Sequence, residues 1–148
     1  MWTPTLVLIA AATLAACALL GGGLYETAVV DPVWPKRPGI IQPRNGGISR
    51  RRFWIPVHTV FEVLLIVSLI AAWSEPDARL TLLVALVSHA AMRVWSLLDF
   101  VPKAVEFEKA DPASVDEDAA RAWTRRSLAR LALDLVTCVA MLAALAIA

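Results

Sequence analysis

The sequence predicts an all-α integral membrane protein, a four-helix bundle whose helices run alternately up and down. Hydrophobic residues make up 59% of the 148 residues, far more than in a soluble domain. They gather in four runs, each long enough to cross a hydrocarbon core of about 30 Å. The net charge of only +1 argues against a nucleic-acid partner and leaves the lipid bilayer as the predicted environment. The predicted spans are 4–28, 53–73, 78–101 and 122–147 of one domain.

The first span contains Gly21-Gly22-Gly23, and these small residues favour close packing against a neighbouring helix. Glu26 closes the span. The connection 29–52 holds four prolines and the turn Asn45-Gly46-Gly47, so it is not expected to be helical. A connection of this length is expected to act as a lid.

The second span follows the run Arg50-Arg51-Arg52, which indicates a membrane face. Trp54 and Trp73 are expected to anchor its two ends at the interfaces. Pro56 is expected in the first turn of the helix, where its missing N–H costs nothing.

The third span is expected to end before Pro102, and 102–113 reads as a polar connection. Ser114 and Glu117 have the spacing of a capping box for the fourth helix. Cys17 and Cys138 lie in separate apolar runs without a Cys-x-x-Cys motif, so they are predicted to be packing thiols and not a dithiol site.

The basic residues predict the orientation, because lysine and arginine favour cytoplasmic connections. Eleven of the 14 lie in or beside the first and third connections: Lys36, Arg37, Arg44, Arg50, Arg51, Arg52, Lys103, Lys109, Arg121, Arg125 and Arg126. The protein is therefore predicted in a bacterial inner membrane with both termini outside and connections 1 and 3 in the cytoplasm.

Ionisable residues from all four spans gather at one depth, in the cytoplasmic half: Glu26, His58, Glu62, His89, Arg93, Asp99, Arg130 and Asp134. Each charge would cost about 2.5–3.5 kcal/mol if it faced lipid, so a shared polar pocket inside the bundle is predicted. Three pairs have the i, i+4 spacing of one helix face: His58/Glu62, His89/Arg93 and Arg130/Asp134. The alternative is that these groups are only salt bridges that hold helices together.

As chemistry, His58 is predicted to be a general base or a metal ligand, Glu62 to orient it, and Arg93 to hold an oxyanion. Further substrate contacts are predicted from Glu26, His89, Asp99 and Trp54. The cofactor is unknown: either none or a transition metal, with His58, Glu62, His89 and Glu26 as candidate ligands. Haem is less favoured, because the two histidines differ in depth.

Several motifs lie along most of the chain: Gly21-Gly22-Gly23-Leu24-Tyr25-Glu26, Pro32-Val33-Trp34, Arg52-Phe53-Trp54-Ile55-Pro56-Val57-His58, Ala72-Trp73, Arg93, Asp99-Phe100-Val101-Pro102, Trp123, Ser127 and Arg130. Together they resemble the anthrone-oxygenase-like family of small bacterial four-helix membrane proteins. The resemblance implies oxidation of anthrones to anthraquinones, as associated with fungal members, without a conventional cofactor. It also implies that Glu26, His58 and Arg93 belong to a shared pattern.

The predicted function is a small membrane oxidoreductase or oxygenase-like enzyme acting on a lipid-soluble aromatic or quinone-like molecule. The alternative is a non-catalytic accessory or assembly subunit of a larger membrane complex, and a homo-oligomer is left open as well. A transporter is less favoured, because the outer half of the bundle lacks polar residues to continue a path.

Overall fold

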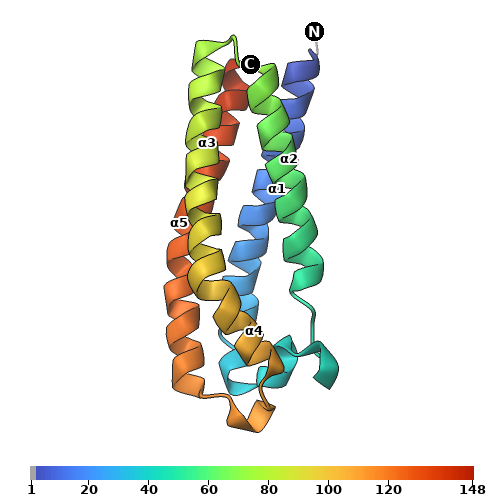
Figure 1. Cartoon of the computed structure of the whole chain (residues 1–148), viewed down its shortest axis with the longest axis vertical. Coiled ribbons are helices and arrows are strands. Elements are labelled where there is room, and N and C mark those ends of the chain that lie inside the picture. Colours follow the sequence, from blue (N-terminus) through green and yellow to red (C-terminus); the bar gives the residue numbers. More distant parts are fainter. Residues whose placement is uncertain (1–2) are drawn as a thin grey trace.

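Residues 3–148 are described by a computed structural model, in which they form five α-helices and no strand (Figure 1). The helices are α1 (Pro4–Tyr25), α2 (Arg51–Ala71), α3 (Pro76–Trp95), α4 (Val101–Lys109) and α5 (Glu117–Ile147). Both termini and the short α2–α3 turn lie at one end of the bundle, here called the terminal end. The longer connections lie at the other end, here called the loop end. The predicted all-α, up-down-up-down four-helix bundle is confirmed.

Four helical stretches are long and apolar enough to cross a membrane: Pro4–Val30, Arg51–Ala71, Pro76–Lys109 and Glu117–Ile147. Their outer surfaces carry large apolar side chains that no other part of the chain covers. Leu14, Ile70 and Leu98 are 73%, 70% and 77% exposed. So much exposed apolar surface needs a lipid environment, and the chain is an integral membrane protein.

The interior contains two apolar clusters. A terminal cluster includes Ile9, Phe61 and Met141, all fully buried towards the terminal end. A loop cluster, built around Trp34 and Phe100, packs at the loop end. The terminal cluster comes from α1, α2, α3 and α5, whereas the loop cluster comes from the π-helical turns, the first connection, α4 and α5. The polar residues gather between the two clusters.

Two π-helical turns interrupt the regular helices at the loop end. Glu26–Val30 extends α1, and Ser96–Phe100 joins α3 to α4. The third helix therefore does not end before Pro102, as predicted, but continues to Lys109. The π-helical turn has already interrupted the i to i−4 hydrogen-bond pattern. Pro102 lies in the first turn of α4, where the missing backbone N–H of proline costs little stability. Beyond this turn, α4 runs obliquely across the loop end (Figure 1).

The first connection is compact, although its prolines predicted no helix. It contains three short 3-10 turns: Trp34–Lys36, Pro38–Ile41 and Pro43–Asn45. Gln42, which is fully buried, fastens it to the end of α4. Its side-chain amide donates to the carbonyl oxygens of Phe107 and Ala110, at 2.8 and 3.0 Å. These bonds satisfy two carbonyls that the end of a helix leaves free.

Two predicted helix starts are wrong by one turn or less. Helix α2 already begins at Arg51, so Pro56 lies inside it. Helix α5 begins at Glu117 with Asp116, not Ser114, as its cap. The Asp116 carboxylate accepts from the backbone N–H groups of the first turn, because an aspartate directly before a helix reaches them best.

The predicted close packing at the glycine run holds for two of its three members. A Cβ atom at Gly22 would meet the Phe53 ring of α2, and one at Gly23 would meet the Leu131 side chain of α5. Gly21 has open space around it. The two tight positions let α1 approach both neighbours at the level of the polar residues.

Cys17 on α1 and Cys138 on α5 face each other, with their sulfur atoms 3.4 Å apart. We expect a lipid-soluble oxidant such as copper phenanthroline to join them, because only a small rotation brings the sulfurs to bonding distance. Mass spectrometry after alkylation should then show the loss of both modifiable thiols. Cys138→Ser should leave Cys17 alkylatable. Two thiols that stay free in the oxidised wild type would contradict this α1–α5 packing.

Candidate functional site

A cavity of about 480 Å³ lies at the loop end of the bundle and is lined by residues of all four membrane helices. Its polar lining consists of Glu26, Thr27, Asp31, Arg50, Arg51, Trp54, His58, Thr59, Arg93, Ser96, Glu108, Trp123, Ser127, Arg130 and Asp134. Both π-helical turns contribute to it. Such turns are frequent at functional sites, since they redirect side chains that a regular helix would place elsewhere.

The cavity opens on an apolar outer face between α2 and the α3–α4 helix. Ile55 lines it from α2, and Leu97 and Val101 line it from the other side. These three side chains are also 62%, 53% and 41% exposed on the outside of the protein. Residues that are exposed and also line the cavity mark its mouth. Thr59 and the half-exposed Arg51 of α2 meet the same criterion, so the mouth is mainly apolar and has a polar edge on α2.

His58 lies on the cavity wall and has no hydrogen-bond partner anywhere in residues 3–148. Its ring stacks on Trp54, with centroids 5.6 Å apart and planes at 27°. The His89 ring packs on it from α3, at 5.5 Å. Its Nδ1 atom is fully enclosed and unpaired. Buried polar atoms are almost always paired, so an unpaired imidazole in a cavity is a candidate ligand-binding group.

Glu62 bridges α2 to α3. Its Oε1 atom accepts from Arg93 Nε at 2.8 Å and lies 3.3 Å from His89 Nε2. The predicted role of Glu62 was to orient His58, which lies one turn away on the same helix, but the structure joins it to the two residues of α3. Glu62 and His89 lie behind the cavity wall, whereas His58 and Arg93 belong to the wall itself.

Glu26 is held by two donors on separate oxygens. Arg50 Nη1 donates to Oε1 at 2.9 Å, and Trp54 Nε1 donates to Oε2 at 2.7 Å. The Arg50 guanidinium also lies over the rings of Trp34 and Trp123, at 5.8 and 5.5 Å. Sequence reasoning took Arg50 only as a marker of the membrane face. No local pattern could have shown its inward position, because its partners come from three other segments.

Asp31 lies directly after the first membrane helix and was not predicted. Burial, with a further contribution from the nearby Glu26, raises its pKa from 3.8 to about 6, although the Trp34 hydrogen bond opposes the shift. Trp34 Nε1 donates to its Oδ1 atom at 3.0 Å. Asp31 is therefore a carboxyl group that changes charge near neutral pH at the edge of the cavity.

Arg130 also differs from its predicted arrangement. Its guanidinium donates to the hydroxyl groups of Ser96 and Ser127 and lies 4.2 Å from the centre of the Phe100 ring. No ion pair with Asp134 forms within the described part of the chain, although both residues line the cavity. The guanidinium is thus a cation with capacity left for a ligand, since its Nε atom is buried without a partner.

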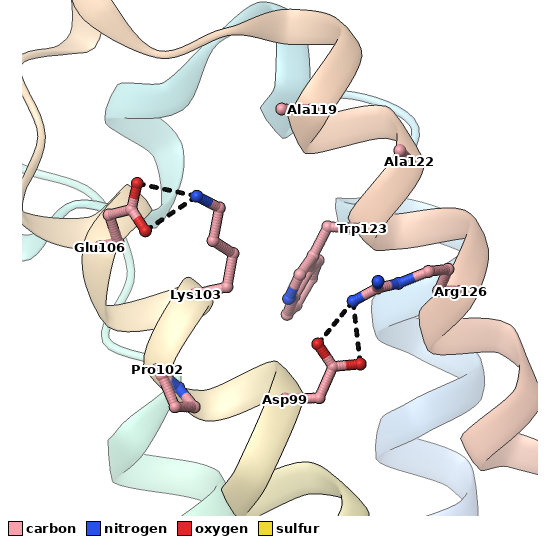
Figure 2. Close-up of a pocket in the computed structure, with 8 residues that line it drawn as sticks. All are labelled: Asp99, Pro102, Lys103, Glu106, Ala119, Ala122, Trp123 and Arg126. Carbon is pink, nitrogen blue, oxygen red and sulfur yellow. Dashed lines mark hydrogen bonds and ion pairs between the residues drawn. The ribbon is translucent and has the colours of Figure 1, made fainter.

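Asp99 lies outside this cavity, in a second pocket of about 480 Å³ between α4 and α5 (Figure 2). There it accepts from Arg126 at 2.7 and 2.9 Å, and Lys103 pairs with Glu106 beside it. All four charged side chains are more than a third exposed. Exposed pairs of this kind contribute little and leave no charge free, so the first cavity is the better candidate site.

Three of the four candidate metal ligands lie together. One ligand atom from each of His58, Glu62 and His89 lies within 4.8 Å of the others. Glu26 belongs to a different part of the cavity, where Arg50 and Trp54 occupy its oxygens.

No protein-family model, curated protein or solved structure matches this chain. Its function is therefore argued from the chemistry of the cavity.

Proposed function

We propose that the protein is a small membrane oxygenase-like enzyme that oxidises a lipid-soluble aromatic or quinone-like molecule in the cavity at its loop end. The observation that carries this proposal is the combination of a mainly apolar mouth with an unpaired His58 and a cationic Arg93 in the wall. The sequence resemblance to anthrone-oxygenase-like proteins points to the same substrate class.

The size and lining of the cavity support binding of a flat aromatic ligand. A volume of about 480 Å³ is within the range of about 300–1,000 Å³ for small-molecule sites. Trp54 and Phe100 contribute aromatic surface to the wall, and the exposed residues at the mouth offer a route from the bilayer. An apolar substrate would partition into lipid first and then enter sideways.

The polar residues suit the oxidation of an acidic C–H group beside an aromatic ketone. His58 takes the proton with its free nitrogen lone pair, and the charge moves onto the ketone oxygen. Arg93, fixed by Glu62, holds that oxygen as the anion forms. Dioxygen is the second substrate. One of its atoms becomes the new carbonyl oxygen, and the other leaves as water with the two hydrogens of the former CH₂ group.

The arrangement in the cell is part of the proposal. The positive-inside rule places the loop end, with the cavity, on the cytoplasmic side of the inner membrane and both termini outside. The substrate would therefore react in the inner leaflet. The product, a quinone, would return to the bilayer through the same mouth.

The test uses anthrone as the probe and purified protein in lipid nanodiscs. Oxygen consumption and the absorbance of anthraquinone should both rise well above the rate with empty nanodiscs. His58→Ala should lower the catalysed rate by about 10²–10⁴-fold, the usual contribution of a general base. A His58→Ala protein that keeps its rate would refute the role of His58.

Val60→Ala is the matched control, because Val60 is on the same helix and 52% exposed to the outside. It should leave the rate unchanged. A folded wild-type protein that neither oxidises nor binds hydroxylated and quinone-like aromatics would contradict the proposal and favour an accessory subunit.

A further inference from the structure

His58, Glu62 and His89 form a compact group of two imidazoles and one carboxylate. His58 and Glu62 come from one face of α2, and His89 faces them from α3. Their ligand atoms lie within 4.8 Å of one another. Neighbouring donors bound to one ion at about 2.1 Å are about 3.0–3.4 Å apart in octahedral or tetrahedral geometry. Side-chain rotations would therefore have to shorten the longest separation by roughly 1–2 Å to bring all three onto one metal.

The histidines of this group lack other partners. Neither nitrogen of His58 is paired within the described residues, and the Nδ1 atom of His89 is buried and unpaired as well. The rings are nevertheless held in place, since His58 stacks on Trp54 and His89 packs edge-on against Phe61. The one hydrogen bond of these imidazoles, between His89 and Glu62, lies within the group itself. Imidazoles fixed in this way are suited to donate a lone pair to an ion.

The carboxylate of the group is oriented by a neighbouring cation. Both recorded contacts of Glu62, from Arg93 and from His89, fall on Oε1. Its Oε2 atom is therefore the oxygen available to a ligand. A carboxylate that binds a metal is commonly fixed in this way by an outer hydrogen bond, and Arg93 supplies it here.

We propose that His58, Glu62 and His89 bind one divalent transition-metal ion, and that Fe(II) is the ion that the donor set favours. Two histidines and one carboxylate with open positions are typical of non-haem iron sites that react with dioxygen. His58 belongs to the cavity wall, so an open position would face the substrate. The ion would bind dioxygen and the ionised substrate oxygen.

The catalytic meaning of this site rests on the proposed function, but its binding test does not. If the metal is bound, His58 gives its lone pair to the ion and not to the substrate proton. The two roles of His58 exclude each other, so the measurements below separate them.

The first experiment is titration of tag-free protein with Co²⁺ under reducing conditions, followed by its visible absorption, and with Fe²⁺ without oxygen, followed by metal analysis. We expect one ion per chain. The chain has two histidines in all, and both are in the group. His58→Gln, His89→Gln and Glu62→Gln should each weaken binding at least about tenfold. Glu75→Gln, an exposed carboxylate change at the terminal end, should not.

A second measurement avoids the variants. In protein labelled with ¹⁵N-histidine, one equivalent of Co²⁺ should broaden the ring signals of both histidines together. Unchanged ring signals, or binding that survives His58→Gln and His89→Gln, would overturn the metal site. Stoichiometric binding without oxidation of any aromatic would uphold the site and refute the proposed function. Equal oxidation by chelator-treated protein would uphold the proposed function and refute a catalytic role for the ion.

Discussion

Arg50→Ala should destabilise the protein by about 3–5 kcal/mol, the usual cost of removing one partner from a buried ion pair. The side chains of Arg50 and Glu26 are only 11% and 18% exposed. Without Arg50, the Glu26 carboxylate would keep a single donor, Trp54. The loop cluster would also lose the guanidinium that lies over the rings of Trp34 and Trp123. The measurement is unfolding in detergent micelles, followed by circular dichroism.

The neighbouring arginines are matched controls, because the three are consecutive and carry the same charge. Arg51 is half exposed and pairs with Glu108 at 3.3 Å, so Arg51→Ala should cost at most about 1 kcal/mol. Arg52 is exposed and makes no side-chain bond in the described residues, so Arg52→Ala should stay within about 0.5 kcal/mol. Equal losses in all three would show that only the basic character of the run matters.

The loss in Arg50→Ala should also grow with pH. Burial and Glu26 hold the pKa of Asp31 at about 6, and Arg50 is one of the groups that lower it. In wild type, the protonated Asp31 favours the folded state, so this contribution is complete below pH about 4 and is lost as pH rises through about 6. Without Arg50, the folded-state pKa rises further. The variant should therefore be closer to wild type at pH 5 than at pH 8.

The difference between Arg50 and Arg52 shows what the sequence could not provide. Apolar runs predict the four spans, because the bilayer fixes their length and composition. Basic runs predict a membrane face by composition alone. Which of three adjacent arginines turns inward depends on Glu26 and two tryptophans at distant positions. Such contacts leave no periodic signal in the chain.

Helix ends were predicted less well for a related reason. Pro102 is usually a sign that a helix has stopped, and here the helix continues to Lys109. The π-helical turn at Ser96–Phe100 changes the hydrogen-bond register before the proline is reached. A π-helical turn depends on the packing of the surrounding side chains, and single-sequence patterns do not encode it.

The gathering of the site residues was predictable, but their pairing was not. Burying ionisable groups at one depth is expensive unless they meet, and the structure brings His58, Glu62, His89 and Arg93 together. The i, i+4 rule then paired residues within each helix, whereas Glu62 binds across to α3. In a bundle, an inward-facing side chain meets the opposite helix before its own neighbour. Asp99 likewise pairs with a residue of another helix, Arg126 of α5, and so lies in the second pocket.

Gln42→Glu should be the second strongly destabilising change, at about 3–5 kcal/mol at pH 8. The amide nitrogen of Gln42 donates to two carbonyl oxygens of α4, those of Phe107 and Ala110. A carboxylate of the same shape would present an oxygen to both acceptors. Two donated hydrogen bonds are lost. The buried Phe107 carbonyl remains unpaired, at about 1–3 kcal/mol, whereas the Ala110 carbonyl keeps its bond from Arg44. The larger cost is the buried charge of the carboxylate, for which Asn45 is the donor already in place. Unfolding in micelles again measures the effect.

Arg44→Ala is the matched control for Gln42→Glu. Arg44 donates to the same Ala110 oxygen, at 2.6 Å, but from an exposed position. Water can replace the hydrogen bond from this exposed side chain, so Arg44→Ala should cost less than about 1 kcal/mol. If Arg44→Ala were as damaging as Gln42→Glu, the Ala110 carbonyl itself, and not the buried amide, would be the attachment point.

The sign of the pH dependence identifies the cause of the Gln42→Glu effect. Burial against two carbonyls would raise the pKa of the new carboxyl group above its unfolded value of about 4.3. Its protonated form can donate one hydrogen bond, so stability is retained below pH about 4.3 and lost as pH rises through the folded-state pKa. The loss relative to wild type at the same pH should therefore be smaller at pH 5 than at pH 8. Helix α4 contributes Val101 and Val105 to the cavity, so binding of an aromatic probe should weaken in parallel. Unchanged binding in the destabilised variant would show that the attachment of the first connection to α4 does not affect the site.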